Sequence, residues 1–205
     1  MNKIKILIAC AAVATGGLPA SAADFSDPTW PCIQRKVTGL TPALMWPDIP
    51  SEVDLPEAQD SAVKELAAAL SLQRVDMDHA AELVAEFTAA QGHDATLLAQ
   101  VFARTFHALE TRRGRIINGI GDFSRGQIEL SKRVDATRAQ MDALMAQDAP
   151  DYDTVDALEE QLDWDERIFI DRQQSITYLC ETPVLLEKRL FAISQLLQEA
   201  SKAGG

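Results

Sequence analysis

The sequence predicts an all-α protein: one long antiparallel helical hairpin of coiled-coil type, two shorter helices packed on it, and a Pro-rich extended N-terminal arm. Three observations predict this fold. Two long stretches repeat apolar residues at alternating spacings of four and three, as heptad helices do. A short turn sequence separates the two stretches, which favours antiparallel packing. No stretch shows the strict apolar–polar alternation of a strand.

The two long helices are expected at about 95–148 and 153–201, with Pro150 breaking the helix in the turn between them. If the turn centres near residue 150, the numbers of facing residues sum to about 300, so that Phe102 meets Leu197. Two heptad helices of this length would form a rod of roughly 80 Å at 1.5 Å per residue.

Charge favours the same register. Residues 148–171 are strongly acidic, and Arg167 is the only base among them. Folding back would set Lys132, Arg133 and Arg138 against part of this acidic stretch. Single exposed ion pairs contribute little, but several together favour this register over slipped ones.

Two shorter helices precede the hairpin. The first is expected from about Pro56 to Arg74, because proline suits the start of a helix. The second is expected from Asp76, a capping residue, to Gln91. Gly92 follows and suits a helix end. The bundle therefore occupies 56–205.

The arm, residues 23–55, is rich in proline and carries Trp30 and Trp46. Proline lacks the amide donor that a helix interior needs, so the arm should be extended, with one helical turn starting at Thr41. Its apolar content is too high for a free linker. We expect it to lie across the helices, attached through Cys32.

The first 22 residues are typical of a cleaved signal peptide. Two lysines precede an apolar run at 6–14, and Ala20-Ser21-Ala22 supplies small residues for cleavage after Ala22 or Ala23. The run is too short for a membrane anchor. We therefore expect a periplasmic or secreted protein, and the alternative is a lipoprotein anchored at Cys10.

Cleavage would leave two cysteines, Cys32 and Cys180. An even count in an oxidising compartment predicts a disulfide. The alternatives are two buried thiols or an intermolecular bridge.

The chain is acidic, with a formal net charge of −12 at pH 7. Loss of Lys3 and Lys5 with the signal peptide would make it more negative. Nucleic acids and anionic membranes bind basic surfaces, so neither is an expected partner. No segment after the signal is apolar enough to span a bilayer, and we expect no membrane-spanning helix in the mature protein.

Helix-breaking residues interrupt both long helices. Four glycines lie in the first helix, and Pro183 lies in the second, close to Cys180. Each glycine costs up to about 1 kcal/mol and an interior proline roughly 3 kcal/mol. In the favoured interpretation they make room for the arm to cross; in the alternative they line a ligand cleft. The glycines are Gly114, Gly119, Gly121 and Gly126.

Arg113 occupies a seam position beside this zone. A partly desolvated arginine can bind an anionic ligand or a partner carboxylate. It can equally pair inside the chain, with an acid of the arm or with Glu181 or Glu187, and internal pairing is favoured. The candidate ligand or partner site comprises Arg112, Arg113, Arg115, Gly119 and Gly121.

No metal or cofactor site is expected. His107-x-x-Glu110 reverses the order of the Glu-x-x-His pair of di-iron bundles and occurs once. His79 and His93 stand alone. Acids at 151, 153 and 156 lack the glycine and distant glutamate of a calcium loop. Helix capping explains them best, and weak cation binding is the alternative.

No nucleophile elbow or phosphate-binding glycine loop occurs. We therefore expect a non-enzymatic scaffold, adaptor or accessory factor that acts by protein–protein interaction. Its partner would be another periplasmic protein or a second copy in a homodimer. The alternative is a ligand-binding bundle with an anion or small-molecule site near Arg113, Gly119, Gly121 and Pro183. An enzyme ranks third.

Overall fold

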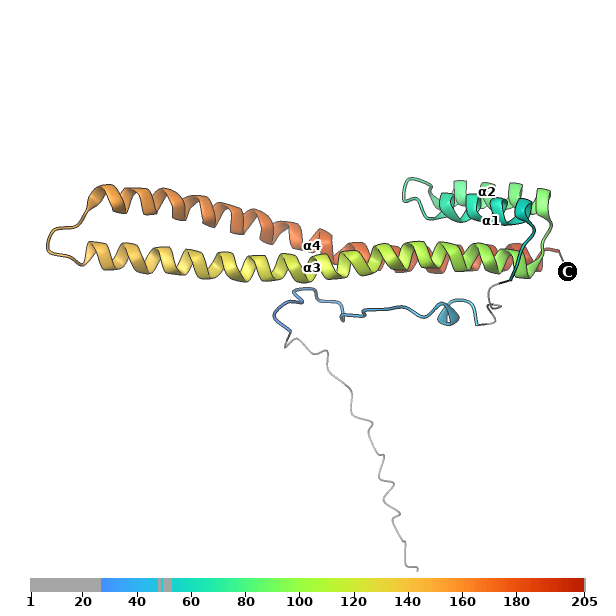
Figure 1. The fold of residues 1–205 in the computed structure, drawn as a ribbon, viewed down its shortest axis with the longest axis horizontal. Coiled ribbons are helices and arrows are strands. Elements are labelled where there is room, and N and C mark those ends of the chain that lie inside the picture. The colour runs from blue at the N-terminus through green and yellow to red at the C-terminus, as the bar shows by residue number, and fades with distance from the viewer. Residues whose placement is uncertain (1–26, 48, 50–52, 205) are drawn as a thin grey trace, which may run out of the picture.

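The computed structural model describes residues 27–47, 49 and 53–204. Four α-helices form in this part of the chain, without any strand (Figure 1). The predicted all-α class is confirmed, with the two long helices packed together. The predicted signal peptide lies outside the described residues. Within the described residues, none of the helices combines the length and apolarity that crossing a membrane requires.

The two long helices, α3 (Ala95–Met145) and α4 (Tyr152–Lys202), contain 51 residues each. They run antiparallel and meet in a short turn at the far end of the molecule (Figure 1). Asp94 begins α3 by accepting hydrogen bonds from the amides of Thr96 and Leu97, at 2.7 and 3.0 Å. Such caps satisfy donors that have no partner inside the helix.

Asp151 begins α4 in the same way, accepting from the amide of Thr154 at 3.2 Å and its hydroxyl at 2.6 Å. These hydrogen bonds, the hydroxyl's first, hold the pKa of the Asp151 carboxyl below its usual range. The acid at the turn thus caps the helix, as one of the two interpretations of this stretch requires.

The two shorter helices, α1 (Glu57–Leu70) and α2 (Met77–Gln91), pack at the other end. Pro56 caps α1 rather than forming its first turn, and the chain leaves the helix at Ser71, earlier than expected. Asp76 caps α2, and Gly92 ends it with φ 84°, a conformation that glycine adopts without strain.

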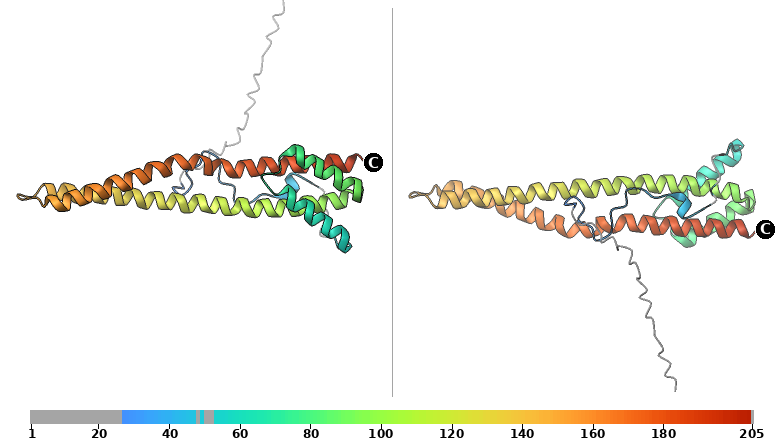
Figure 2. Two further views of the ribbon diagram at one scale, coloured as in Figure 1. Left: turned by 90° about the horizontal axis from the view of Figure 1, so that it is seen from above. Right: turned by 90° about the horizontal axis from the view of Figure 1, so that it is seen from below.

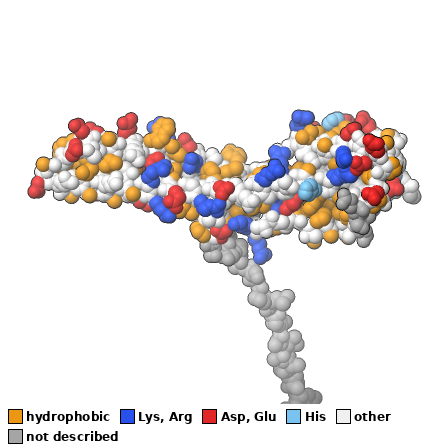
Figure 3. All heavy atoms as spheres, viewed as in Figure 1, with side chains coloured by type: hydrophobic (Ala, Val, Ile, Leu, Met, Phe, Trp, Pro, Cys, Tyr) orange, Lys and Arg blue, Asp and Glu red, His pale blue; other side chains and the backbone are white. Residues whose placement is uncertain are grey.

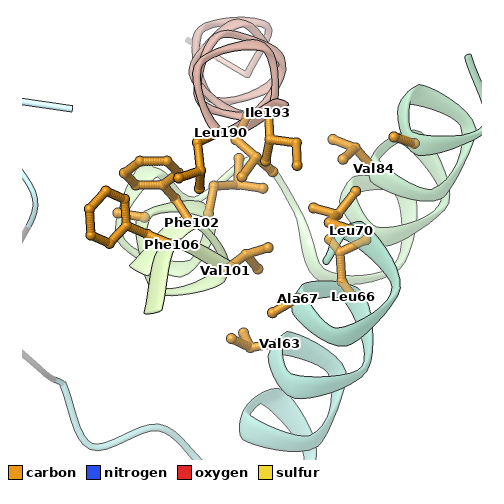
Figure 4. Packing of buried hydrophobic residues seen from close by; sticks show 14 of the residues in the cluster. Val63, Leu66, Ala67, Leu70, Val84, Val101, Phe102, Phe106, Leu190 and Ile193 are labelled. Atoms are coloured by element: carbon orange, nitrogen blue, oxygen red, sulfur yellow. The ribbon is translucent and has the colours of Figure 1, made fainter. Parts of the chain in front are cut away.

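The main core joins all four helices and the arm. Val63, Leu66 and Leu70 of α1 point toward Val101 of α3 (Figure 4). Phe102 is fully buried, and its ring lies 5.5 Å from that of Trp46 in the arm. We call this end of the molecule the base.

The arm runs alongside α3 and α4, on the side opposite α1 and α2 (Figures 1 and 2). Its described residues form no α-helix, only a short 3-10 helix, η1 (Pro42–Leu44), next to the turn predicted at Thr41. The carbonyl of Met45 accepts hydrogen bonds from Ser194 and Gln198 of α4, at 2.9 and 3.0 Å.

Beyond the arm, toward the turn, α3 and α4 pack only on each other (Figure 2). We call this half, residues 126–174, the tip. Arg133 and Arg138 of α3 pair there with Asp165 and Glu166 of α4, at 2.8 and 2.6 Å. These pairs match the charge-based expectation. Lys132 does not, because it pairs with Glu129 of its own helix at 2.9 Å.

Candidate functional site

The middle of the molecule holds the predicted disulfide. Cys32 of the arm is bonded to Cys180 of α4, with their Cα atoms 5.5 Å apart, so the prediction is confirmed. Both cysteines are buried and pack with Ile120 of α3 in a small second core. The arm is therefore fastened covalently to α4 near the middle of the hairpin.

Arg113, which is only 2% exposed, lies next to this core. Its Nε donates to Oε1 of Glu187 in α4 at 2.8 Å, and its Nη2 lies 2.7 Å from the same oxygen. Nη2 also donates to the carbonyl of Val37 in the arm, at 2.7 Å. Nη1 lies 3.4 Å from the carboxylate of Glu110. The side chain thus joins α3, α4 and the arm, as expected for internal pairing.

Glu110 extends this connection. Its Oε1 accepts a hydrogen bond from the backbone amide of Leu40 in the arm, at 3.1 Å. Arg113 therefore holds the arm through a carbonyl and Glu110 holds it through an amide, one turn apart on α3. The carboxylate of Glu187 and the guanidinium of Arg113 compensate each other, which a buried charge requires.

The glycines were expected to make room for the arm, and only one of them touches it. A Cβ atom on Gly121 would lie 3.9 Å from the carbonyl oxygen of Thr29, in ordinary contact. Ser124 Oγ donates to the carbonyl of Pro28 nearby, at 2.9 Å. Gly114 and Gly119 face open space, so for these two the expectation is wrong. Nothing in the structure explains glycine at either position.

The other two candidate arginines point elsewhere. Arg112 donates to Gln73, in the loop between α1 and α2, at 3.0 Å. Arg115 and Gly119 are exposed, whereas Arg113 and Gly121 are buried. The three arginines therefore do not converge on one site. Pro183 lies inside α4, three residues after Cys180, and is buried.

The histidines are also dispersed. His79 lies 3.0 Å from Glu82 on the surface of α2. His93 forms a hydrogen bond with the carbonyl of Ala200, at 2.7 Å, between the start of α3 and the end of α4. His107 is exposed. Across the described ranges no cluster of three metal-ligating side chains occurs.

A different surface carries large apolar side chains that are exposed and belong to neither of the two cores. The outward side of α4, turned away from α3, exposes large apolar residues over most of its length. Exposed apolar patches of this kind mark contact sites more often than chance. We call this surface the outer face of α4. Its apolar members are Trp164 (63% exposed), Ile170 (51%), Tyr178 (76%), Leu185 (55%) and Phe191 (51%).

The outer face continues into a groove between the two helices of the tip. This groove, about 230 Å³ in volume, is bordered by Val134 and Arg138 of α3 and by Phe169 and Ile170 of α4. Hydrophobic side chains interleaved with charged ones are visible on the surface of the tip (Figure 3). Apolar surface rimmed by charges is what a protein contact site requires.

Ion pairs join the two helices near the groove, and one of them, Arg138 with Glu166 at 2.6 Å, borders it. Asp165 is buried and accepts two hydrogen bonds from Arg133, at 2.8 and 3.1 Å. This carboxylate raises the pKa of the Arg133 guanidinium, first through the hydrogen bonds and then through its charge. The two helices are thereby held together beside the groove.

The sequence contained a signal for the outer face. The heptad seam of α4 accounts for residues such as Leu158, Leu162 and Ile176. Trp164, Tyr178 and Leu185 are multiples of seven residues apart but lie off the seam, where a two-helix hairpin meets water. Apolar residues repeating on the second side of a helix indicate a second packing partner.

Comparison of the chain with protein-family models, with curated proteins and with solved structures finds no match.

Proposed function

We propose that this protein acts outside the cytoplasm as a scaffold, adaptor or accessory factor, binding protein through the outer face of α4 and catalysing no reaction. The observation that carries the proposal is the row of exposed apolar side chains on that face. Trp164 and Tyr178 are 63% and 76% exposed, although each could bury a large area against a partner. Aromatic residues of this kind dominate the energy of protein interfaces.

The architecture supports the same proposal. The disulfide and Arg113 fasten the arm to the middle of the hairpin, while the tip extends away from the base (Figure 1). A rigid base with a projecting pair of helices presents a long surface to another protein. Ligand binding near Arg113, Gly119, Gly121 and Pro183 has less support, because Arg113 already donates to Glu187 and Val37.

Location outside the cytoplasm rests on the signal-like N-terminus and on the Cys32–Cys180 disulfide, which oxidising compartments favour. Intact mass and N-terminal sequencing of protein isolated from the source organism test it. We expect a chain that begins at residue 23 or 24. A chain that keeps residues 1–22 and is recovered from the cytoplasm would contradict the proposed location.

Photo-crosslinking in the living cell tests the contact surface. A photoreactive phenylalanine analogue replaces Trp164 or Tyr178 on the outer face, and Gln140, an exposed residue of α3 in the tip, in the control. We expect a protein adduct of defined mass from positions 164 and 178 and little from 140. No adduct from either outer-face position, or equal adducts from all three, would contradict the proposed function.

A further inference from the structure

The outer face of α4 carries a line of polar residues spaced by seven. All five are exposed. In the described structure none of the four charged members forms an ion pair within the chain, in contrast to Arg133 and Arg138. The spacing keeps the line on one side of a supercoiled helix. In order along α4 the residues are Glu160, Arg167, Gln174, Glu181 and Lys188.

The line is complementary to itself when it is reversed. If two copies pack about a two-fold axis at Gln174, Glu160 of one copy faces Lys188 of the other. Arg167 likewise faces Glu181, and the two Gln174 side chains meet on the axis. A two-fold interface forms every pair twice, so four ion pairs result. We propose that the outer face of α4 binds a second copy of this chain, antiparallel, about this axis.

The apolar residues that flank the line fit the same register. Facing residues then have numbers that sum to about 348, which sets Ile170 against Tyr178 of the second copy. Trp164 meets the neighbourhood of Val184 and Leu185, and Phe191 meets the small Ala157. Five exposed apolar side chains of α4 would thereby be covered. Each of these contacts also forms twice.

Charge decides between the two orientations of the copies. A parallel pair would place the acidic residues 148–171 beside themselves. The antiparallel pair places them beside residues 177–200, which carry two basic and three acidic residues and are therefore far less negative. Repulsion between like charges destabilises an arrangement that brings them together, and attraction between opposite charges favours one register. In an acidic protein this difference favours the antiparallel dimer.

The inference rests on the proposed function, since it names the partner of the same surface. It differs from binding of another protein in one respect: only a second copy requires the line to be self-complementary. A heterologous partner has no reason to match Glu160 with Lys188 and Arg167 with Glu181 on the same helix.

Charge reversal with mixing tests the register. Arg167→Glu sets glutamate against Glu181 at two places, and Glu181→Arg sets arginine against Arg167 at two places. Each variant alone should dimerise on the order of ten-fold more weakly than the natural chain. In a mixture, one copy of each forms a heterodimer in which both kinds of pair are attractive. Equilibrium sedimentation of the separate variants and of the mixture measures this.

Matched controls are Arg74→Glu and Glu86→Arg, which change the charge equally on exposed residues away from α4. They should leave dimerisation within about two-fold of the natural chain, because distant exposed charges are screened. Helix content by circular dichroism checks that every variant folds. A natural chain that stays monomeric at high concentration, or a mixture no tighter than the separate variants, overturns the proposal.

Cysteine cross-linking tests the position of the axis without disturbing charge. Gln174→Cys should form a disulfide-linked dimer on mild oxidation, because the two residues meet at the axis. Gln173→Cys, equally exposed but about 100° around the helix, should stay largely monomeric. Cys32 and Cys180 are bonded to each other, and a chain that begins at residue 23 lacks Cys10. Equal cross-linking at 173 and 174, or none at 174, contradicts the proposed axis.

The outcomes separate this inference from the proposed function. A monomer whose outer face still gives adducts with a different protein rejects the second copy and leaves the proposed function standing. A monomer that gives no adducts rejects both.

Discussion

The base and the tip are built from the same two helices, but they differ in how the helices are packed. In the base, α3 and α4 share a core with α1, α2 and the arm, and Phe102, Leu186 and Leu190 are fully buried. In the tip each helix has only the other as a neighbour. The comparison teaches that one heptad seam can join a shared core at one end and a projecting pair of helices at the other.

Side chains at the seam of the tip show the same difference. Asp165 and Thr137 are buried there, and Gln127 donates to the carbonyl of Phe169 at 3.1 Å. Polar seam residues fix the register at a cost in stability. The polar seam residues thus fix how the two helices of the tip pair, but they add little stability. Local unfolding of the tip should therefore cost less free energy than local unfolding of the base.

The largest expected difference comes from truncating a core side chain at each end. Phe102→Ala removes a fully buried ring that contacts Trp46 and Phe106. It should lower the free energy of unfolding by about 3–5 kcal/mol. Leu144→Ala, at a half-buried position near the turn, should cost about 1 kcal/mol or less. Urea denaturation measures both, and equal losses would mean that the tip is as well packed as the base.

Removing the disulfide should have the next largest effect. The double variant Cys32→Ser, Cys180→Ser frees the arm from α4 and increases the number of conformations that the unfolded chain can adopt. A loss of about 2–4 kcal/mol is expected. Chemical reduction of the natural chain is the matched control and should reproduce the loss. Unchanged stability after reduction would show that the arm is held by its hydrogen bonds alone.

Arg113→Met tests the buried attachment between the arm and the two helices. The substitution leaves Glu187 and the carbonyl of Val37 without their donor. A buried group without its partner costs about 1–3 kcal/mol, and the lower part of this range is expected because Glu187 is partly exposed. Arg113→Lys keeps the charge with fewer donors and should lose less. Thermal denaturation of the two variants, with Arg115→Met as an exposed control, gives the comparison.

The smallest effect concerns Asp27 at the start of the described arm. The Thr29 hydroxyl and then Lys36 donate to its carboxylate and lower its pKa from 3.8 to about 2. A carboxyl with a lowered pKa stabilises the folded chain above pH 3.8, and this contribution is lost as the pH falls through about 2. Carbon NMR titration should give a midpoint near 2 for Asp27. A midpoint near 3.8 would show that this turn is not formed.

Much of the fold followed from local chemistry. Proline in the turn, aspartates at the helix starts and the apolar repeat together determine where the long helices begin and end. The signal-like N-terminus suggested the disulfide, and a seam arginine among acids suggested an internal pair, for which Glu187 was one of three candidates. These features depend on one or two residues and their nearest neighbours, so sequence alone could predict them.

The site could not be predicted in the same way. Arg112, Arg113 and Arg115 are close in sequence but point to three different surroundings. Whether Gly114 and Gly119 face the arm depends on where the arm crosses the hairpin, and that is set by contacts between residues far apart in the sequence. The outer face of α4 was not predicted, because Trp164 and Tyr178 lie off the heptad seam. An apolar residue off the seam has meaning only once the neighbours of each helix are known.

Hydrogen exchange followed by mass spectrometry tests the division into base and tip most directly. At low protein concentration, amides at 97–109 and 186–197 should exchange on the order of one hundred-fold more slowly than those at 134–145 and 152–162. Both sets lie in α3 and α4, so helix type and solvent are matched. Uniform exchange along both helices would contradict the account, because it would mean that the hairpin opens as one unit.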